Sequence, residues 1–252
     1  MPYIERGGAQ IFYTSDGEGP PVLLSHGFSA TSEMWAGQIA AFRQRHQIIV
    51  WDMLGHGQSD SPDDPALYTP EGAVKDMAAI LDACGAGSAV IGGHSMGGFL
   101  SLAFNMNYPQ RVRGIMLFNT GPGYKSDEAR EQWNVMAHKQ ARAFADKGLA
   151  ALGRSEEMQL GKHRSALGLE HGARGMLAQQ DARVIDSLPN IRVPTLVLVG
   201  EKDRAYMAAT DYMTGKIPDG RKVMIADAGH AANIHQPAAF NAAMGEFLNS
   251  LD

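Results

Sequence analysis

Cysteine is nearly absent from this chain of 252 residues, which contains only Cys84. One thiol cannot form a disulfide within the chain, and it cannot build a zinc site from several cysteines. We interpret Cys84 as a small apolar residue near the end of a helix. The sequence also lacks an HExxH motif, a Walker A motif and a GxGxxG motif. We therefore expect no metal site and no cofactor.

An excess of positive charge is missing as well. The chain has 22 Lys and Arg against 27 Asp and Glu, a net charge of −5. Proteins that bind nucleic acids contact phosphates with clustered basic residues, so we expect no nucleic-acid partner. No apolar run approaches the roughly 20 residues of a membrane-spanning helix, and no basic segment precedes an apolar one at the N-terminus. These absences predict a cytoplasmic protein without membrane contact.

The rest of the composition is ordinary, with 44% hydrophobic and 19% charged residues. Short apolar runs alternate with segments of helical spacing, which is typical of a mostly parallel sheet with helices on both faces. Strands are predicted at residues 21–25, 47–51, 88–92, 112–118, 193–199 and 222–225. A long helix is predicted over 128–152, in a region without strand signals. We expect an α/β core (1–121 and 188–252) with residues 122–187 inserted as a helical cap.

The most informative motif is Gly93-His94-Ser95-Met96-Gly97, a G-x-S-x-G pattern between a predicted strand and a predicted helix. In this context the motif forms a sharp turn that exposes the serine hydroxyl. Its glycines remove Cβ atoms that would collide in so tight a turn. Amides at the start of the following helix favour developing negative charge. We predict that Ser95 is a nucleophile.

A serine nucleophile needs a base, and the base needs an acid that orients it. Asp203 follows the predicted strand 193–199, and His230 follows the strand 222–225. Both therefore lie beyond the ends of strands, where open α/β sheets place their sites. The chain order serine, acid, histidine is that of hydrolases with this kind of nucleophile turn. We predict His230 as the base and Asp203 as the orienting acid, with Glu201 as the second choice.

These motifs together resemble the α/β-hydrolase fold family, in its branch with a serine nucleophile. His26-Gly27-Phe28 is similar to the family's oxyanion segment, and residues 52–59, DMLGHGQS, are similar to its D-x-x-G-x-G-x-S turn. The resemblance covers most of residues 20–121 and 191–250. It implies the α/β-hydrolase fold and an oxyanion hole formed by the backbone N–H groups of Phe28 and Met96. The chain is most similar to small esterases and to the 3-oxoadipate enol-lactonase-like group.

Residues and resemblance together predict a hydrolase that cleaves a small carboxylic ester or lactone through an acyl-enzyme on Ser95. Carbon–carbon bond hydrolases and cofactor-free haloperoxidases or perhydrolases use the same triad, and these activities stay open. A ligand-sensing receptor that retains the triad is an alternative of another class. We expect a monomer or a homodimer. The side chains predicted to line the substrate pocket are Phe28, Trp133, Met136, Phe144 and Ile234.

Overall fold

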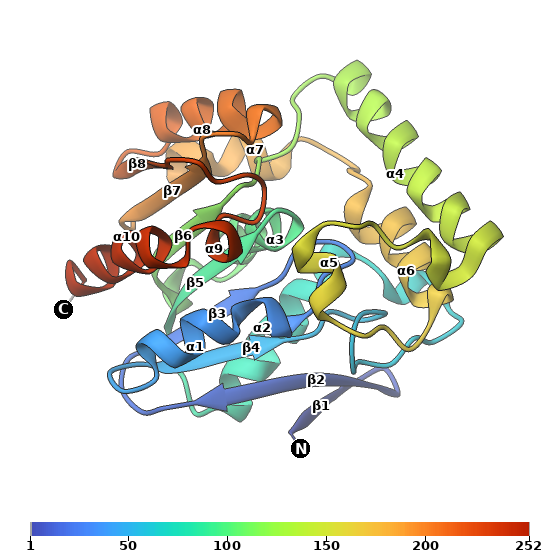
Figure 1. Ribbon diagram of the computed structural model, residues 1–252, viewed down its shortest axis with the longest axis horizontal. Helices are drawn as coiled ribbons and strands as arrows, with labels where there is room; N and C mark the ends of the chain where they lie inside the picture. Colours follow the sequence, from blue (N-terminus) through green and yellow to red (C-terminus); the bar gives the residue numbers. More distant parts are fainter. Residues whose placement is uncertain (1, 252) are drawn as a thin grey trace.

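A computed structural model describes residues 2–251 and shows one twisted sheet between two layers of helices (Figure 1). The strand order is β1-β2-β4-β3-β5-β6-β7-β8. Strand β2 pairs antiparallel with β1 and β4, and every other neighbouring pair is parallel. The strands are β1 (Tyr3–Arg6), β2 (Ala9–Asp16), β3 (Pro21–Ser25), β4 (Gln47–Trp51), β5 (Ala89–His94), β6 (Val112–Phe118), β7 (Thr195–Gly200) and β8 (Gly220–Ile225). The predicted architecture, a mostly parallel sheet covered by helices on both faces, is confirmed.

The helices of the core form the two covering layers. They are α1 (Ala36–Phe42), α2 (Pro70–Ala83), α3 (Met96–Asn107), α8 (Arg204–Lys216), α9 (Ala232–His235) and α10 (Pro237–Asn249). Short 3-10 turns are η1 (Ser32–Trp35), η2 (Pro65–Leu67) and η3 (Pro109–Arg111). Helix α2 begins where Thr69 accepts a hydrogen bond from the N–H of Gly72, with Pro70 as its first residue. A threonine cap followed by proline is a strong start signal because it satisfies a free N–H group and presets the backbone angle.

Alternation along the strands explains the two layers. Successive side chains of a strand point to opposite faces of a sheet, and the central strands carry apolar side chains on both faces. Leu23 therefore joins one hydrophobic core, with residues of α2, α3 and α8. Its neighbour Leu24 joins the other core, with residues of α1, α9 and α10. Burial on both faces is what fixes the register of these strands.

Between β6 and β7 the described chain forms helices only, and we call residues 119–194 the inserted segment. Its elements are α4 (Asp127–Lys147), η4 (Gly148–Ala151), α5 (Glu156–Leu160), α6 (Ala166–Gly172), η5 (Ala173–Leu177), α7 (Arg183–Ser187) and η6 (Leu188–Asn190). The predicted helix over 128–152 ends earlier, at Lys147, because Gly148 adopts a positive φ of 59°. The segment packs closely on the core, since a Cβ on Gly168 would lie 2.6 Å from the Cα of Gly55.

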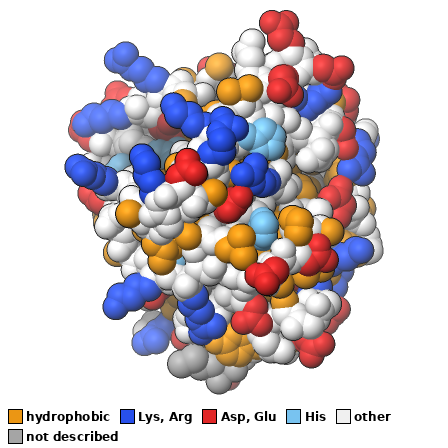
Figure 2. Space-filling view, turned by 90° about the vertical axis from the view of Figure 1, so that its right-hand side faces the viewer, with side chains coloured by type: hydrophobic (Ala, Val, Ile, Leu, Met, Phe, Trp, Pro, Cys, Tyr) orange, Lys and Arg blue, Asp and Glu red, His pale blue; other side chains and the backbone are white. Residues whose placement is uncertain are grey.

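The outer face of the inserted segment carries several exposed apolar side chains. Val135, Leu149 and Leu160 are each at least 39% exposed. The space-filling view of this side shows apolar side chains lying among charged ones of both signs (Figure 2). Within residues 2–251, the structure contains no helix with the length and apolar character that crossing a membrane requires.

The central strands should carry most of the stability. Leu198 on β7 is fully buried, whereas Met224 on the edge strand β8 is 52% exposed. We expect Leu198→Ala to lower the free energy of unfolding by about 2–5 kcal/mol, because it leaves a cavity. The control Met224→Ala should change it by about 0.5 kcal/mol or less. Urea unfolding of both variants measures this, and equal losses would contradict the account of the core.

Candidate active site

Ser95 lies at the sharp turn between β5 and α3, at the carboxyl edge of the sheet. Its φ of 51° and ψ of −116° are rare for a residue with a side chain, and such strain costs about 1–3 kcal/mol. Only glycine fits on either side of the turn. A Cβ on Gly93 would lie 2.2 Å from the carbonyl carbon of Gly97, and one on Gly97 would lie 2.3 Å from the backbone oxygen of Ser25. The turn therefore holds the Ser95 side chain outward, on the wall of a cavity.

His230 and Asp203 form a hydrogen-bonded pair beside this turn. The Nδ1 atom of His230 lies 2.8 Å from Oδ2 of Asp203. Asp203 is 8% exposed, so water screens this pair weakly. Glu201, the second choice for the acid, is exposed, and its Oε2 accepts the N–H of Asp227 at 3.0 Å. The imidazole of His230 is thus paired with Asp203 and not with Glu201.

Two residues that sequence reasoning missed support this arrangement from the end of β6. Asn119 donates from Nδ2 to Oδ2 of Asp203 at 2.8 Å and to the carbonyl of Gly229 at 3.2 Å. Its φ of 50° is tolerated because asparagine visits the left-handed region more readily than most residues. Thr120 donates from Oγ1 to the carbonyl of Ser95 at 2.5 Å. Both follow a predicted strand, and that position was the only signal in the sequence.

The segment after β3 passes directly beside the nucleophile turn. A Cβ on Gly27 would lie 3.2 Å from the Cβ of Ser95. Phe28 follows, and Ser29 has a positive φ of 61°. The ring of Phe28 is buried against His56 and Phe144, at centroid distances of 5.6 and 6.1 Å. This segment brings the backbone of Phe28 to the same edge of the sheet as Met96, the first residue of α3.

Two histidines hold this segment in place. His26 donates from Nδ1 to the carbonyl of Gly27 at 2.7 Å, and its Nε2 accepts the N–H of Met53 at 3.0 Å. His163 of the inserted segment accepts the N–H of Gly57 at Nδ1 and donates from Nε2 to the carbonyl of Ser29. Each ring therefore uses one nitrogen as a donor and the other as an acceptor, which requires the neutral form.

Burial lowers the pKa of these imidazoles. It lowers the pKa of His26 to about 4, although Asp52 acts in the opposite direction. Burial also lowers the pKa of His163, against the effect of its hydrogen bond to Ser29 and of Asp52. The pKa of His56, whose ring contacts both, falls well below the usual 6.5 through burial and through those two neighbours. The surroundings of the Phe28 segment therefore favour the neutral form of these three histidines.

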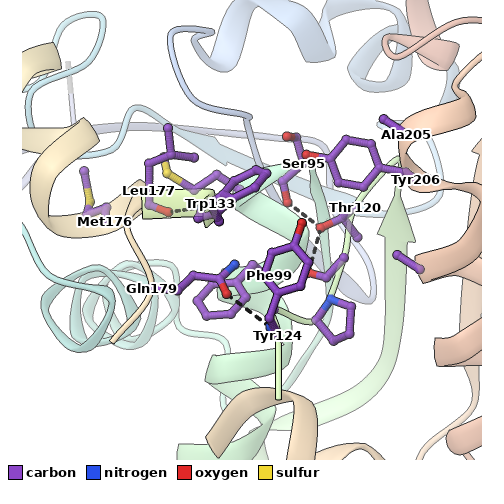
Figure 3. Close-up of a pocket in the computed structure, with 15 residues that line it drawn as sticks. Ser95, Phe99, Thr120, Tyr124, Trp133, Met176, Leu177, Gln179, Ala205 and Tyr206 are labelled. Atoms are coloured by element: carbon purple, nitrogen blue, oxygen red, sulfur yellow. Dashed lines mark hydrogen bonds between the residues drawn. The ribbon is translucent and has the colours of Figure 1, made fainter. Parts of the chain in front are cut away.

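The cavity beside Ser95 has an empty volume of about 580 Å³, part of it open to solvent. Its walls come from both the core and the inserted segment (Figure 3). None of the described lining residues is charged. They are Ser95, Met96, Phe99, Thr120, Gly121, Pro122, Gly123, Tyr124, Trp133, Met176, Leu177, Gln179, Ala205, Tyr206 and Ala209.

Of the five side chains predicted for the pocket, Trp133 lines this cavity and the other four are not among its described lining residues. Phe144 and Phe28 are buried in the core on the α2, α3 and α8 side. Ile234 packs against the opposite core. Met136, on α4 with Trp133, is not part of the described lining. Trp133 itself is anchored by a hydrogen bond from Nε1 to the carbonyl of Leu177 at 2.8 Å.

Within residues 2–251, no three His, Cys, Asp or Glu side chains are grouped so that they could hold a metal ion. The arrangement offers a hydroxyl, an imidazole with a carboxylate partner, and a neutral apolar cavity.

Comparison with known proteins agrees with this geometry. Residues 20–179 match the model of the alpha/beta hydrolase fold family, and the chain belongs to that family. A putative 2-succinyl-6-hydroxy-2,4-cyclohexadiene-1-carboxylate synthase of Bacillus subtilis is 28% identical, over 96% of each chain. A thermophilic esterase from Thermogutta terrifontis is 29% identical with a TM-score of 0.85, covering 99% of this chain and 97% of that one. The enol-lactonase from Burkholderia xenovorans is 27% identical with a TM-score of 0.80, covering 98% and 100%.

Stability should fall in mild acid, because the folded state keeps these histidines neutral while the unfolded chain protonates them below pH 6.5. Their contribution is complete above that pH and is lost as the pH falls toward the folded-state pKa, about 4 for His26. Each such histidine lowers the free energy of unfolding by up to about 1.4 kcal/mol for each pH unit of acidification. We expect a steep fall in the thermal midpoint between pH 6.5 and 4. In His163→Gln the thermal midpoint should fall less steeply over this pH range. An unchanged pH dependence in this variant would contradict the assignment of the effect to the neutral histidines.

Proposed function

We propose that this α/β-hydrolase is a serine hydrolase that cleaves small, uncharged carboxylic esters or lactones. The single observation that supports it best is the strained Ser95 on the wall of an uncharged cavity, next to the bonded His230 and Asp203 pair. The esterase and the enol-lactonase among the similar structures support the same reaction class.

In the proposed mechanism, Ser95 attacks the substrate carbonyl while His230 removes the hydroxyl proton at Nε2. Asp203 holds the imidazole by its Nδ1 and stabilises the positive charge that the ring gains. Asn119 fixes the Asp203 carboxylate by donating to the same oxygen that accepts from His230. The negative charge on the carbonyl oxygen is stabilised by the N–H groups of Phe28 and Met96. His230 then returns its proton to the leaving oxygen, and water releases the acyl group by the reverse sequence.

The inserted segment acts as a lid in this proposal. Trp133 and Leu177 of the segment face Ser95 and Tyr206 of the core across one cavity. Such a cover excludes water from the site, and electrostatic interactions are stronger where water is excluded. His163 ties the lid to the Phe28 segment through Ser29, so the cover and the oxyanion amides are held in one relative position.

Removing the nucleophile is the direct test of the mechanism. We expect Ser95→Ala to lower kcat/KM for p-nitrophenyl esters by at least about 10⁴-fold. The control Ser250→Ala, at an exposed serine on the other end of the chain, should leave it unchanged. Residual ester turnover in Ser95→Ala close to wild type would contradict the proposal. Turnover that depends on Ser95 for a carbon–carbon substrate but for no ester would favour the carbon–carbon hydrolase reading.

The cavity should also discriminate by charge. Its described lining has no Lys or Arg to pair with a carboxylate, and burying an unpaired charge is costly. The carboxylate in the name of the Bacillus relative's product is therefore a poor fit for this cavity. We expect kcat/KM for ethyl butyrate to exceed that for monoethyl succinate by at least about 10-fold.

Gln179→Lys should lower the ratio of kcat/KM for ethyl butyrate to kcat/KM for monoethyl succinate, because it adds a cation to the cavity wall. Gln180→Lys adds the same charge at an exposed neighbour and should leave the ratio as it is. A wild-type preference for the succinate ester would contradict the proposed substrate class.

A further inference from the structure

Tyr206 contacts both partners of the proposed reaction, although it belongs to none of the motifs in the sequence. It lies in the first turn of α8, three residues after Asp203. Its ring stacks on the imidazole of His230, with centroids 5.0 Å apart and planes inclined by 22°. Its side chain and that of Ser95 line the same cavity, and the interaction between the two hydroxyls acts to lower the pKa of the phenol. The close-up shows the ring reaching from α8 toward Ser95 across the cavity (Figure 3).

The strand order shows on which side of Ser95 Tyr206 lies. Ser95 follows β5, which lies between β3 on one side and β6 and β7 on the other. Phe28 follows β3, so its amide approaches Ser95 from the first side. Tyr206 and His230 follow β7 and β8, so both approach from the opposite side. A carbonyl oxygen held by the Phe28 amide therefore points away from Tyr206.

The leaving oxygen lies on the side of the base, because the base must give it a proton. Tyr206 is stacked on that base, and its hydroxyl interacts with the Ser95 side chain, whose Oγ bonds to the reacting carbonyl carbon. Burial raises the pKa of Tyr206, against the effect of its interaction with Ser95, so the phenol stays protonated at neutral pH. A protonated phenol in this position is a hydrogen-bond donor to the leaving oxygen.

We propose that Tyr206 is a further catalytic residue, whose hydroxyl turns from Ser95 to the leaving oxygen and stabilises the charge that develops there. This inference rests on the proposed function. The Ser95 proton passes to His230 as the bond from Oγ to the carbonyl carbon forms. The same proton then moves to the leaving oxygen as its bond to carbon breaks. Tyr206 keeps its own proton throughout, and in a lactone the leaving oxygen is the ring oxygen.

The test compares two leaving groups on one acyl group, ethyl butyrate and p-nitrophenyl butyrate, in wild type and Tyr206→Phe. The ethoxide is a poor leaving group that needs a donor, and the nitrophenolate is a good one that does not. We expect kcat/KM to fall about 10–100-fold for the ethyl ester and less than about 3-fold for the nitrophenyl ester. Tyr212→Phe, on the same helix but outside the described cavity lining, should change neither.

Equal losses for the two esters would overturn the inference, because they would mean that Tyr206 only positions His230. No loss for the ethyl ester would overturn it as well. The thermal midpoint of Tyr206→Phe checks folding, and Tyr206→Met provides a second variant without a donor. A wild type that shows no Ser95-dependent turnover of either ester overturns the proposed function instead.

Discussion

The close approach of Gly93 to Gly97 is the constraint on which the rest of this site depends. With no Cβ on either residue, the chain reverses from β5 into α3 within one residue, and Ser95 takes the strain. The loops after β3, β6 and β8 carry further residues with positive φ, namely Ser29, Asn119 and Asp227. Strained backbone is thus concentrated at one edge of the sheet, and the strands buried on both faces provide the stability that tolerates it.

Hydrogen bonds connect these strained loops to one another. Asn119 joins the loop after β6 to Asp203 and Gly229, and His94 donates from Nε2 to the carbonyl of His230 at 2.9 Å. His163 adds the inserted segment to the same network. The geometry of the proposed triad is therefore a property of the whole carboxyl edge, and not of three side chains alone. Neutral histidines suit this role because they donate and accept at once without placing charge beside an apolar cavity.

Much of the fold and part of the site could be predicted from the sequence, for reasons that the structure makes clear. Strands buried on both faces appear as apolar runs, and the contact of Gly93 with Gly97 lies within the G-x-S-x-G motif itself. Both features can therefore be predicted from short stretches of sequence. Helix α8 was not predicted, and with it Tyr206 was missed. Asn119 and Thr120 act on partners distant in the sequence, at Asp203 and Ser95, which no local pattern encodes. Phe144 and Ile234 were expected in the pocket because periodicity identifies an apolar face without showing whether that face meets the core or a cavity.

In the proposed mechanism, Ser95 is the only residue that becomes covalently modified during turnover. The most direct test is to label the protein with a fluorophosphonate and map the modified peptide by mass spectrometry, with and without a competing ester. We expect one label, on the peptide that contains Ser95, and we expect the ester to slow its formation. A label on any other residue, or an unlabelled Ser95 in folded protein, would contradict this mechanism.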